Sequence, residues 1–355
     1  MLFYGVRLEK AKEYLCLNGN KLLLYHRDGD GVTSASLLLR FFSGFETIPM
    51  EGPVIDKKMK RFILEKSPSL LCFTDIPIDQ EHEKLKAILN VLPLTKVLII
   101  DHHIPEMDMN SNNVIHINPR LKFKDLYMPA SCIIYKMLKK MNFDVKMLVW
   151  ISAAGIVSDY GMRDCMDIIE ECKKMFPDSI KERDIFLSKI GKVSQLIGSA
   201  ITLKGLRGAE TALQILMASN TYESFISNSL LLKWDKKVWD EIKKLSALFE
   251  KEKEVICNKV ILFEIKSKLN ITSLFSTIIS KKYEDKVIVI RKRHGDMWKI
   301  SARYGKSGIN VGNIMKLASA GIGNGGGHEQ SGGAMINDWE LFKKRVLKCI
   351  AEHCF

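Results

Sequence analysis

The chain has 355 residues, of which 46% are hydrophobic and 27% are charged. This balance excludes a disordered or fibrous protein, and the length exceeds the roughly 250 to 300 residues at which a single core stops growing. We therefore expect a folded protein of two domains. Lysine and arginine number 54 against 41 aspartate and glutamate residues, which gives a formal net charge of +13. Such an excess favours a polyanionic partner, although a lysine-rich solvated surface accounts for it equally well.

The eight cysteines form no CxxC pair, and several lie in apolar runs such as "LLCFTD" and "SCIIY". Reduced, buried thiols of this kind predict a cytoplasmic location. The N-terminal "MLFYGVRLEKAK" lacks the long apolar region of a signal peptide, and "MLVWISAAGIV" at 147–157 is too short to cross a bilayer. We expect no membrane partner.

Short apolar runs that end in polar residues alternate with helix-length stretches through the first half of the chain. The expected strands are "KLLLYHRDGD" (21–30), "LLCFTDIP" (70–77), "KVLIIDHH" (96–103) and "NVIHINPR" (113–120). Between them, "SASLLLRFFSGF" (34–45) and "EKLKAILNVL" (83–92) carry apolar residues at helical spacing. The alternation of strand and helix predicts a parallel sheet that is buried on both faces.

The rest of the chain divides into a helical part and a second mixed part. Helices are expected at 129–141 and 144–161, followed by a lysine-rich helical connector. Strands then return at 259–265, 286–292 and 298–305, with helices at 273–283 and 339–352 and a glycine-rich loop before the last helix. We predict an α/β fold with helices on both faces of a parallel sheet at 1–190, the connector at 191–255 and a smaller α/β domain at 256–355. The active site is expected in a cleft between the two domains.

Acids and histidines stand where the expected strands end. They are His26, Asp28 and Asp30 in "HRDGD", Asp75 in "FTDIP", Asp101, His102 and His103 in "IIDHH", and Asp159 in "GIVSDYG". In an open parallel sheet, ligands bind beyond the carboxyl ends of the strands. Alternate residues of HxDxD would point to one side if the extended geometry continues past the strand. Taken alone, "DGDG" is more often a turn and a single Asp a helix cap, but four such segments at one edge predict a shared site.

Carboxylates and imidazoles without thiolates suit Mn²⁺ or Mg²⁺ better than structural zinc. So many ligands fit two divalent ions, with Mn²⁺ preferred over Mg²⁺. A carboxylate that bridges two ions roughly 3.5 to 4 Å apart can help to generate hydroxide and stabilise the oxygens around phosphorus. The leading chemistry is therefore hydrolysis of a phosphate ester.

These motifs resemble the DHH phosphoesterases, a family named for the triplet at 101–103. "HRDGDG", "TD", "DHH" and "SD" occur in the family's order, and "ISARYG" and "GIGNGGGHEQSGG" resemble the DHH-associated C-terminal domain. The chain looks most like the RecJ-like single-strand exonucleases, particularly the compact archaeal type. The resemblance implies a metal-dependent nuclease of DNA repair or replication.

The resemblance also implies a role for each motif residue. His26, Asp28 and Asp75 would hold one metal, and Asp30, Asp75, His102 and Asp159 would hold the other, so that Asp75 is the bridge. His103 would face the scissile phosphate, and Asp101 would orient a histidine from behind the metals.

The glycine-rich run and Arg303 are the candidates for substrate binding. Gly325, Gly326 and Gly327 would allow backbone amides to approach an anion, and His328 could contact phosphate. The guanidinium of Arg303 matches phosphate oxygens, although a surface ion pair is nearly as good an interpretation of this residue alone. The resemblance assigns both elements to the substrate.

Three functions stay open on the sequence. The first is an exonuclease that acts on single-stranded DNA or RNA. The second is hydrolysis of very short oligonucleotides or cyclic dinucleotides, as in nanoRNases, which a low salt dependence and a preference for dinucleotides would favour. The third is a scaffold protein in a replication complex, for which lost ligands would be the mark; here none is missing. The sequence does not decide between DNA and RNA or the direction of digestion.

Overall fold

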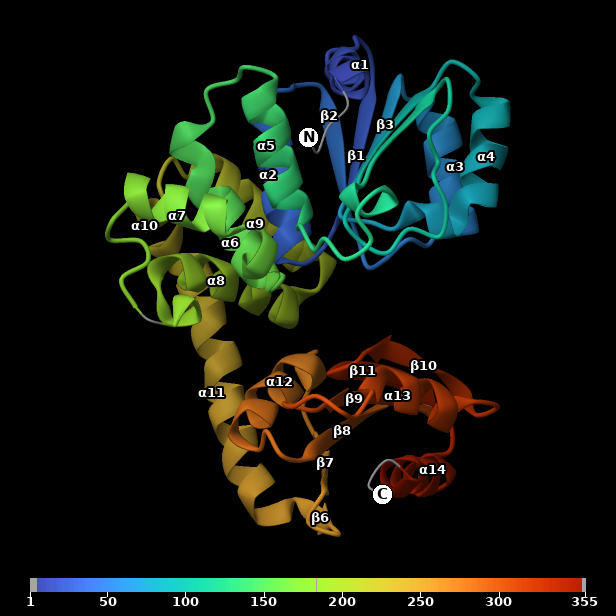
Figure 1. Ribbon diagram of the computed structural model, residues 1–355, viewed down its shortest axis with the longest axis vertical. Helices are drawn as coiled ribbons and strands as arrows, with labels where there is room; N and C mark the ends of the chain where they lie inside the picture. The colour runs from blue at the N-terminus through green and yellow to red at the C-terminus, as the bar shows by residue number, and fades with distance from the viewer. Residues whose placement is uncertain (1–4, 183, 353–355) are drawn as a thin grey trace. The chain divides into compact units, whose positions relative to one another are not determined.

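The structure is a computed structural model that describes residues 5–182 and 184–352. The chain divides into two compact units, residues 1–235 and 236–355 (Figure 1). The seven described cysteines are free thiols, and Cys354 lies outside the described residues. Within the described part of the chain, no helix combines the length and the apolar character that a membrane span requires.

A five-stranded parallel sheet in the order β2-β1-β3-β4-β5 forms the centre of the first unit. Its strands are β1 (Lys21–His26), β2 (Phe45–Met50), β3 (Leu70–Thr74), β4 (Lys96–Ile100) and β5 (Val114–Ile117). Four of them lie inside predicted strand segments. The exception is β2, an edge strand of sequence FETIPM that is mostly half-buried and therefore lacks the apolar run of its neighbours.

Ten α-helices belong wholly to the described part of the first unit. They are α1 (Gly5–Leu15), α2 (Gly29–Leu39), α3 (Lys57–Lys66), α4 (His82–Val91), α5 (Ala130–Lys140), α6 (Val149–Ser158), α7 (Met166–Met175), α8 (Lys189–Lys204), α9 (Leu206–Ala218) and α10 (Tyr222–Ile226). Helices α3 and α4 cover one face of the sheet, and α1, α2 and α5 cover the other (Figure 1). Helices α6 to α10 extend the core on the second side.

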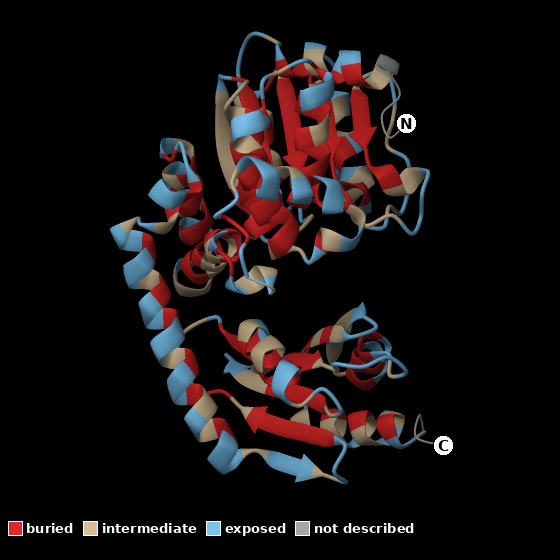
Figure 2. Cartoon of the chain, turned by 60° about the vertical axis from the view of Figure 1, so that its left-hand side comes forward, coloured by how far each residue is buried: buried red, intermediate tan, exposed pale blue. Residues whose placement is uncertain are grey.

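Apolar side chains of each central strand alternate between these two cores. In β1, Leu23 and Tyr25 belong to the core of α1, α2 and α5, whereas Leu22 and Leu24 belong to the core of α3 and α4. Consecutive side chains of a strand point to opposite faces, so a strand that is apolar at every position must be covered on both sides. Figure 2 shows these strands in the buried colour. The predicted α/β fold around a doubly covered parallel sheet is confirmed.

The segment that follows β1 departs from the sequence prediction. We expected extended chain through 21–30, but β1 ends at His26 and α2 begins at Gly29. Asp28 is the N-cap of α2, where its Oδ1 accepts a hydrogen bond from the Gly31 amide at 3.0 Å. The predicted alternation of side chains is therefore wrong beyond His26. A tight strand-to-helix turn places Asp28 and Asp30 instead.

The second unit contains a six-stranded sheet in the order β10-β11-β9-β8-β7-β6. Its elements are β6 (Glu254–Ile256), β7 (Val260–Glu264), α12 (Thr272–Lys282), β8 (Val287–His294), β9 (Met297–Arg303), α13 (Val311–Ser319), β10 (Gly323–His328), β11 (Ser331–Ile336) and α14 (Trp339–Glu352). Only β7 and β8 pair in parallel. The long helix α11 (Ser229–Glu252) begins in the first unit and ends in the second.

We expected the glycine-rich run to be a loop, but it forms a β-hairpin. Gly325, Gly326 and Gly327 lie in β10 and pair with residues of β11 in antiparallel register. The low strand propensity of glycine favours a loop in the sequence, but backbone hydrogen bonds to β11 hold the run in a strand. The glycines leave part of this sheet without side chains.

Candidate metal centre and substrate-binding face

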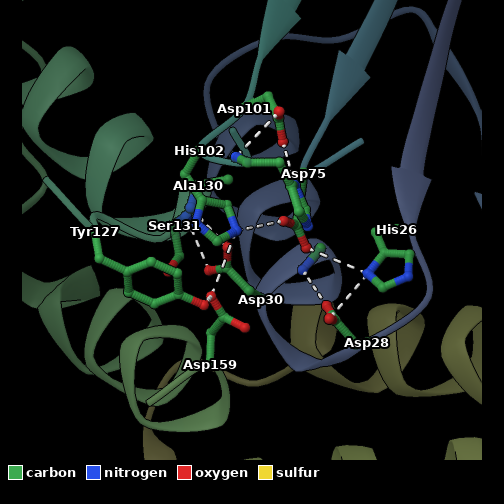
Figure 3. A network of polar contacts seen from close by, with 12 residues as sticks. His26, Asp28, Asp30, Asp75, Asp101, His102, Tyr127, Ala130, Ser131 and Asp159 are labelled. Carbon is green, nitrogen blue, oxygen red and sulfur yellow. Dashed lines mark hydrogen bonds and ion pairs between the residues drawn. The ribbon is translucent and has the colours of Figure 1, made fainter. Parts of the chain in front are cut away.

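The carboxyl edge of the first sheet gathers the predicted metal ligands. The register aligns Tyr25 with Thr74 and Thr74 with Ile100, so the residues that follow these positions emerge at the same edge. These residues are His26, Asp75 and Asp101. Helix α2 contributes Asp28 and Asp30 from its first turn, and Asp159 stands at the C-cap of α6. Figure 3 shows the resulting cluster.

Asp75 lies at the centre of the cluster, between two groups of ligands (Figure 3). Its backbone has a φ of 60°, a conformation that aspartate tolerates better than most residues. The residue is 1% exposed, with Oδ1 3.1 Å from His102 Nε2 and Oδ2 3.5 Å from His26 Nδ1. One carboxylate thus faces both groups, as a bridging ligand requires.

The first group consists of His26, Asp28 and Asp75. One ligand atom from each of these side chains lies within 4.8 Å of the others. His26 Nδ1 stands 2.9 Å from Asp28 Oδ2, while the other oxygen of Asp28 is occupied by the Gly31 amide. The cap of α2 therefore fixes the Asp28 carboxylate and leaves one oxygen directed at the cluster.

The second group consists of Asp30, His102 and Asp159, whose ligand atoms also lie within 4.8 Å of one another. Asp30 is fully buried and accepts hydrogen bonds from the backbone amides of Ala130 at 2.6 Å and Ser131 at 3.0 Å. His102 Nε2 is 3.4 Å from Asp159 Oδ2. The first turn of α5 thus anchors the carboxylate that comes from α2.

His103 forms a third group with Asp75 and His102, whose ligand atoms lie within 4.8 Å of one another, and Asp101 stands beside it. The ring atom His103 Nδ1 and the carboxylate atom Asp101 Oδ1 are 2.8 Å apart, and the His103 amide donates to Asp101 Oδ2 at 3.2 Å. Asp101 is buried, whereas the His103 side chain is 40% exposed. Because the Asp101 carboxylate contacts Nδ1, the second ring nitrogen of His103, Nε2, is the one that can contact another group.

The crowded carboxylates perturb one another's ionisation. Burial raises the pKa of Asp30 well above its ordinary value, and the negative charges of Asp75 and Asp159 raise it further. Burial also raises the pKa of Asp159 to about 6, against the opposing charge of His102. Burial lowers the pKa of His102, but the hydrogen bond and charge of Asp75 outweigh it and raise the pKa to about 10. Positive charge is therefore strongly favoured at the centre of this cluster.

The donor set fits divalent ions. Asp75 Oδ2 is a buried carboxylate oxygen without a hydrogen-bond donor, although it faces the first group. Hard carboxylate oxygens together with imidazole nitrogens are the ligands that Mn²⁺ and Mg²⁺ accept. His26, Asp28 and Asp75 would hold one ion, and Asp30, Asp75, His102 and Asp159 the other.

Sequence reasoning missed Tyr127, which lies in the loop before α5. Its hydroxyl donates to Asp159 Oδ2 at 2.7 Å, and its ring stands edge-on to that of His102 with centroids 5.1 Å apart. Burial, followed by the charge of Asp159, raises the pKa of this hydroxyl, so it stays a donor. A single tyrosine in "KDLYMPA" belongs to no recognisable motif. The amides of Ala130 and Ser131 are backbone groups, which the residue types do not reveal.

Arg303 and the glycine strand form a separate polar face in the second unit. Arg303 Nη2 donates to Ser273 Oγ at 3.0 Å and Nε donates to Thr277 Oγ1 at 3.2 Å, both on α12. The guanidinium lines a hollow of about 320 Å³ together with Lys299, Ser301 and Ser331. His328 ends β10, opposite Ser331. The two bonds to hydroxyl groups orient the guanidinium.

The three predicted anion-binding glycines differ in their surroundings. A Cβ at Gly325 would stand 2.6 Å from the carbonyl oxygen of Met315, and Gly327 has a φ of +147°. Both positions therefore require glycine for the fold itself. A Cβ at Gly326 would meet nothing within 4 Å. Internal packing gives no reason for glycine at 326, which leaves room there for a ligand.

Comparison with known families identifies the class of protein. Residues 22–157 match the DHH family N-terminal domain, and residues 255–352 match the DHHA1 domain. The chain belongs to the DHH family, and the predicted resemblance is confirmed. No curated protein matches the sequence significantly.

Solved structures share the fold at low sequence identity. RecJ from Thermus thermophilus in complex with Mn²⁺ superposes with a TM-score of 0.73 at 14% identity, over 99% of this chain and 55% of that one. CDC45 from Entamoeba histolytica gives 0.62 at 11% identity, over 99% and 100%. The pGpG-specific phosphodiesterase PggH from Vibrio cholerae gives 0.52 at 13% identity, over 94% and 99%. The fold is RecJ-like, and the chain spans about 55% of the length of the Thermus RecJ chain.

Proposed function

We propose that the chain is a two-metal phosphodiesterase that acts as an exonuclease on single-stranded DNA or RNA. The observation that carries this proposal is the set of overlapping ligand groups around the buried Asp75 carboxylate, which belongs to two of the three groups. A structural acidic cluster would gain nothing from keeping a buried carboxylate oxygen without a donor. Membership of the DHH family and the RecJ-like fold support the same chemistry.

The chain's own residues have distinct tasks in this proposal. When bound, two divalent ions would supply an activated water and Lewis acidity at phosphorus. Asp101 holds Nδ1 of the half-exposed His103, which directs the opposite ring nitrogen to the scissile phosphate. Arg303 and the open backbone at Gly326 would bind substrate phosphate. Tyr127 orients Asp159 through its hydroxyl.

A length series of substrates tests the proposal. Purified protein with Mn²⁺ would be given end-labelled DNA and RNA strands of several lengths, single-stranded and as matched duplexes. We expect stepwise release of nucleotides from single strands and no hydrolysis by the Asp75→Ala variant. If the wild-type protein and Asp75→Ala degrade the strands alike, the activity belongs to a contaminant and the proposal fails.

A second candidate is a nuclease of very short oligonucleotides or cyclic dinucleotides. The fold shared with a pGpG-specific phosphodiesterase, over 94% of this chain and 99% of that one, supports it. The same length series separates the two: a rate that peaks at dinucleotides and varies little with salt would replace the exonuclease assignment. A scaffold role in a replication complex would be added to catalysis, since all six predicted ligands lie in the ligand groups.

A further inference from the structure

Helix α3 begins at the edge of the first sheet where the metal ligands lie. It connects β2 to β3, and both strands pair in parallel with β1, so the helix runs back from the carboxyl edge to the amino edge. At its last residue, the carbonyl oxygen of Lys66 accepts a hydrogen bond from Asn20 Nδ2 at 3.1 Å, and Asn20 directly precedes β1. The first turn of α3 therefore lies toward the edge that carries His26 and Asp75.

This first turn concentrates positive charge where a helix is least suited to it. It contains Lys57, Lys58 and Lys60, here called the α3 lysines, and no acid. The amides of a helix N-terminus form the positive end of its dipole, and like charges three residues apart on a helix repel each other. The N-cap Asp56 accepts a hydrogen bond from the Met59 amide at 2.7 Å. One carboxylate at the cap does not offset three ammonium groups.

The rest of α3 compensates its cations within the fold. Lys66 pairs with Glu46 at 2.6 Å and stands over the ring of Phe62, 5.3 Å from its centroid. Arg61 pairs with Glu65 at 2.7 Å. No ion pair joins any of the α3 lysines to an acid within residues 5–182 and 184–352. The helix thus leaves uncompensated the cations that lie nearest the edge of the metal ligands.

A hollow of about 410 Å³ runs along one face of α3. Its lining residues follow one another at helical spacing: Lys57, Lys60, Arg61, Leu64 and Glu65. Lys57 is exposed and Lys60 is half-buried, so both ammonium groups can meet a ligand in this hollow. A row of cations that no acid neutralises attracts a polyanion such as the phosphate backbone of nucleic acid.

The short connection between β2 and α3 limits the distance from the metal ligands to the α3 lysines. Met50, the last residue of β2, stands opposite His26, and its carbonyl oxygen accepts a hydrogen bond from the Arg27 amide at 2.9 Å. Lys57 follows seven residues later, which allows at most about 25 Å between the two Cα atoms. At about 3.4 Å for each stacked nucleotide, roughly eight nucleotides cover this length. A single strand held at the metal centre can therefore reach α3, whereas a dinucleotide cannot span the full distance.

We propose that Lys57 and Lys60 bind backbone phosphates of single-stranded nucleic acid in the hollow of α3, several nucleotides away from the phosphate at the metal centre. The inference rests on the proposed function, because it names how a long strand is held beyond the scissile phosphate. It assigns to α3 a contribution to the affinity for long strands that short oligonucleotides do not receive.

The salt dependence of binding tests this surface. Affinity of the full chain for a dinucleotide and for a single strand of roughly a dozen nucleotides would be measured in EDTA, which prevents hydrolysis, at several salt concentrations. Each phosphate contact contributes about −0.7 to the slope of log K against log salt. Lys57→Ala/Lys60→Ala should therefore make the slope for the long strand shallower by about 1.4 and leave that for the dinucleotide unchanged. Lys57→Arg/Lys60→Arg should keep both slopes.

A matched control removes the same charge from another helix of the first unit. Lys173→Ala/Lys174→Ala takes two exposed lysines from the last turn of α7, where cations suit the helix dipole, and its slopes should stay near those of the wild type. Circular dichroism confirms that each variant is folded.

Three results overturn the proposed surface: an unchanged slope for the long strand in Lys57→Ala/Lys60→Ala, an equal change in the control, or an equal change with the dinucleotide. The first would also be expected if the α3 lysines bind an acidic protein instead of nucleic acid. Hydrolysis by the wild-type chain is scored separately, so that the proposed function can fail while strand binding by α3 stands, and the reverse.

Discussion

The candidate metal centre and the candidate substrate face differ in how their functional side chains are held. In the first unit, buried carboxylates are fixed by backbone amides: Asp30 by two amides of α5, and Asp28 by the start of α2. In the second unit, Arg303 is oriented by two side-chain hydroxyls of α12, and a Cβ at Gly326 would meet only open space. Metal ions need ligands that cannot move, whereas a substrate-binding face must leave room for its substrate. Damage to the first should abolish turnover, and damage to the second should weaken binding.

The largest effect is expected from Asp75→Asn. The amide keeps the shape of the side chain but removes the charge that faces both ligand groups. We expect kcat to fall more than about 100-fold, beyond the roughly 10- to 100-fold loss that follows removal of a group behind a ligand. Asp144→Asn, on an exposed position away from the cluster, is the control. Turnover within a few-fold of the wild type in Asp75→Asn would refute the bridging role.

Two neighbouring glycines should separate folding from binding. Gly325→Ala forces a methyl group to 2.6 Å from the Met315 carbonyl oxygen, so unfolding free energy should fall by about 1–3 kcal/mol. Gly326→Ala places its methyl group in open space and should leave stability within about 0.5 kcal/mol while KM rises. Urea denaturation and steady-state kinetics measure the two. If Gly325→Ala and Gly326→Ala lose the same unfolding free energy, and KM does not change in Gly326→Ala, then residue 326 does not contact the substrate.

Tyr127→Phe should weaken metal binding without disturbing the fold. The substitution removes only the hydroxyl that orients Asp159, so we expect Mn²⁺ affinity to fall about 10-fold. Tyr135→Phe is a matched control, because the Tyr135 hydroxyl donates to Glu171 at 2.8 Å, outside the ligand groups. Mn²⁺ titration compares them. The same affinity in both variants would remove Tyr127 from the site.

Arg303→Lys should give the smallest effect. Lysine keeps the positive charge but loses the planar fork that contacts Ser273 and Thr277. We expect KM to rise several-fold with kcat nearly unchanged. Should kcat fall while KM stays constant, Arg303 contributes to the chemical step instead of to binding.

The sequence predicts four of the five strands of the first sheet and the edge at which ligands gather, because apolar runs that end in acids or histidines indicate buried strands and the ends of those strands. It does not predict the half-buried edge strand β2. It does not predict how Asp28 and Asp30 reach the site, since a tight turn replaces the extended chain after His26. The positive φ of Asp75 and the amides that hold Asp30 also leave no trace in residue types. Tertiary contacts determine them.

The glycine hairpin is a second feature that the sequence alone does not predict. Composition indicated a loop, and only the pairing of β10 with β11 turns the run into a strand. Within it, the different requirements at Gly325 and Gly326 depend on whether α13 lies behind the position. Identical residues in one motif therefore meet different structural requirements.

The number of Mn²⁺ ions that bind per chain tests the two-group centre most directly. Isothermal titration of metal-free protein should give two ions for the wild-type chain and a loss of binding at both sites in Asp75→Asn, because its carboxylate faces both groups. A wild-type chain that binds no Mn²⁺, or two ions whose affinities Asp75→Asn leaves unchanged, would contradict the account.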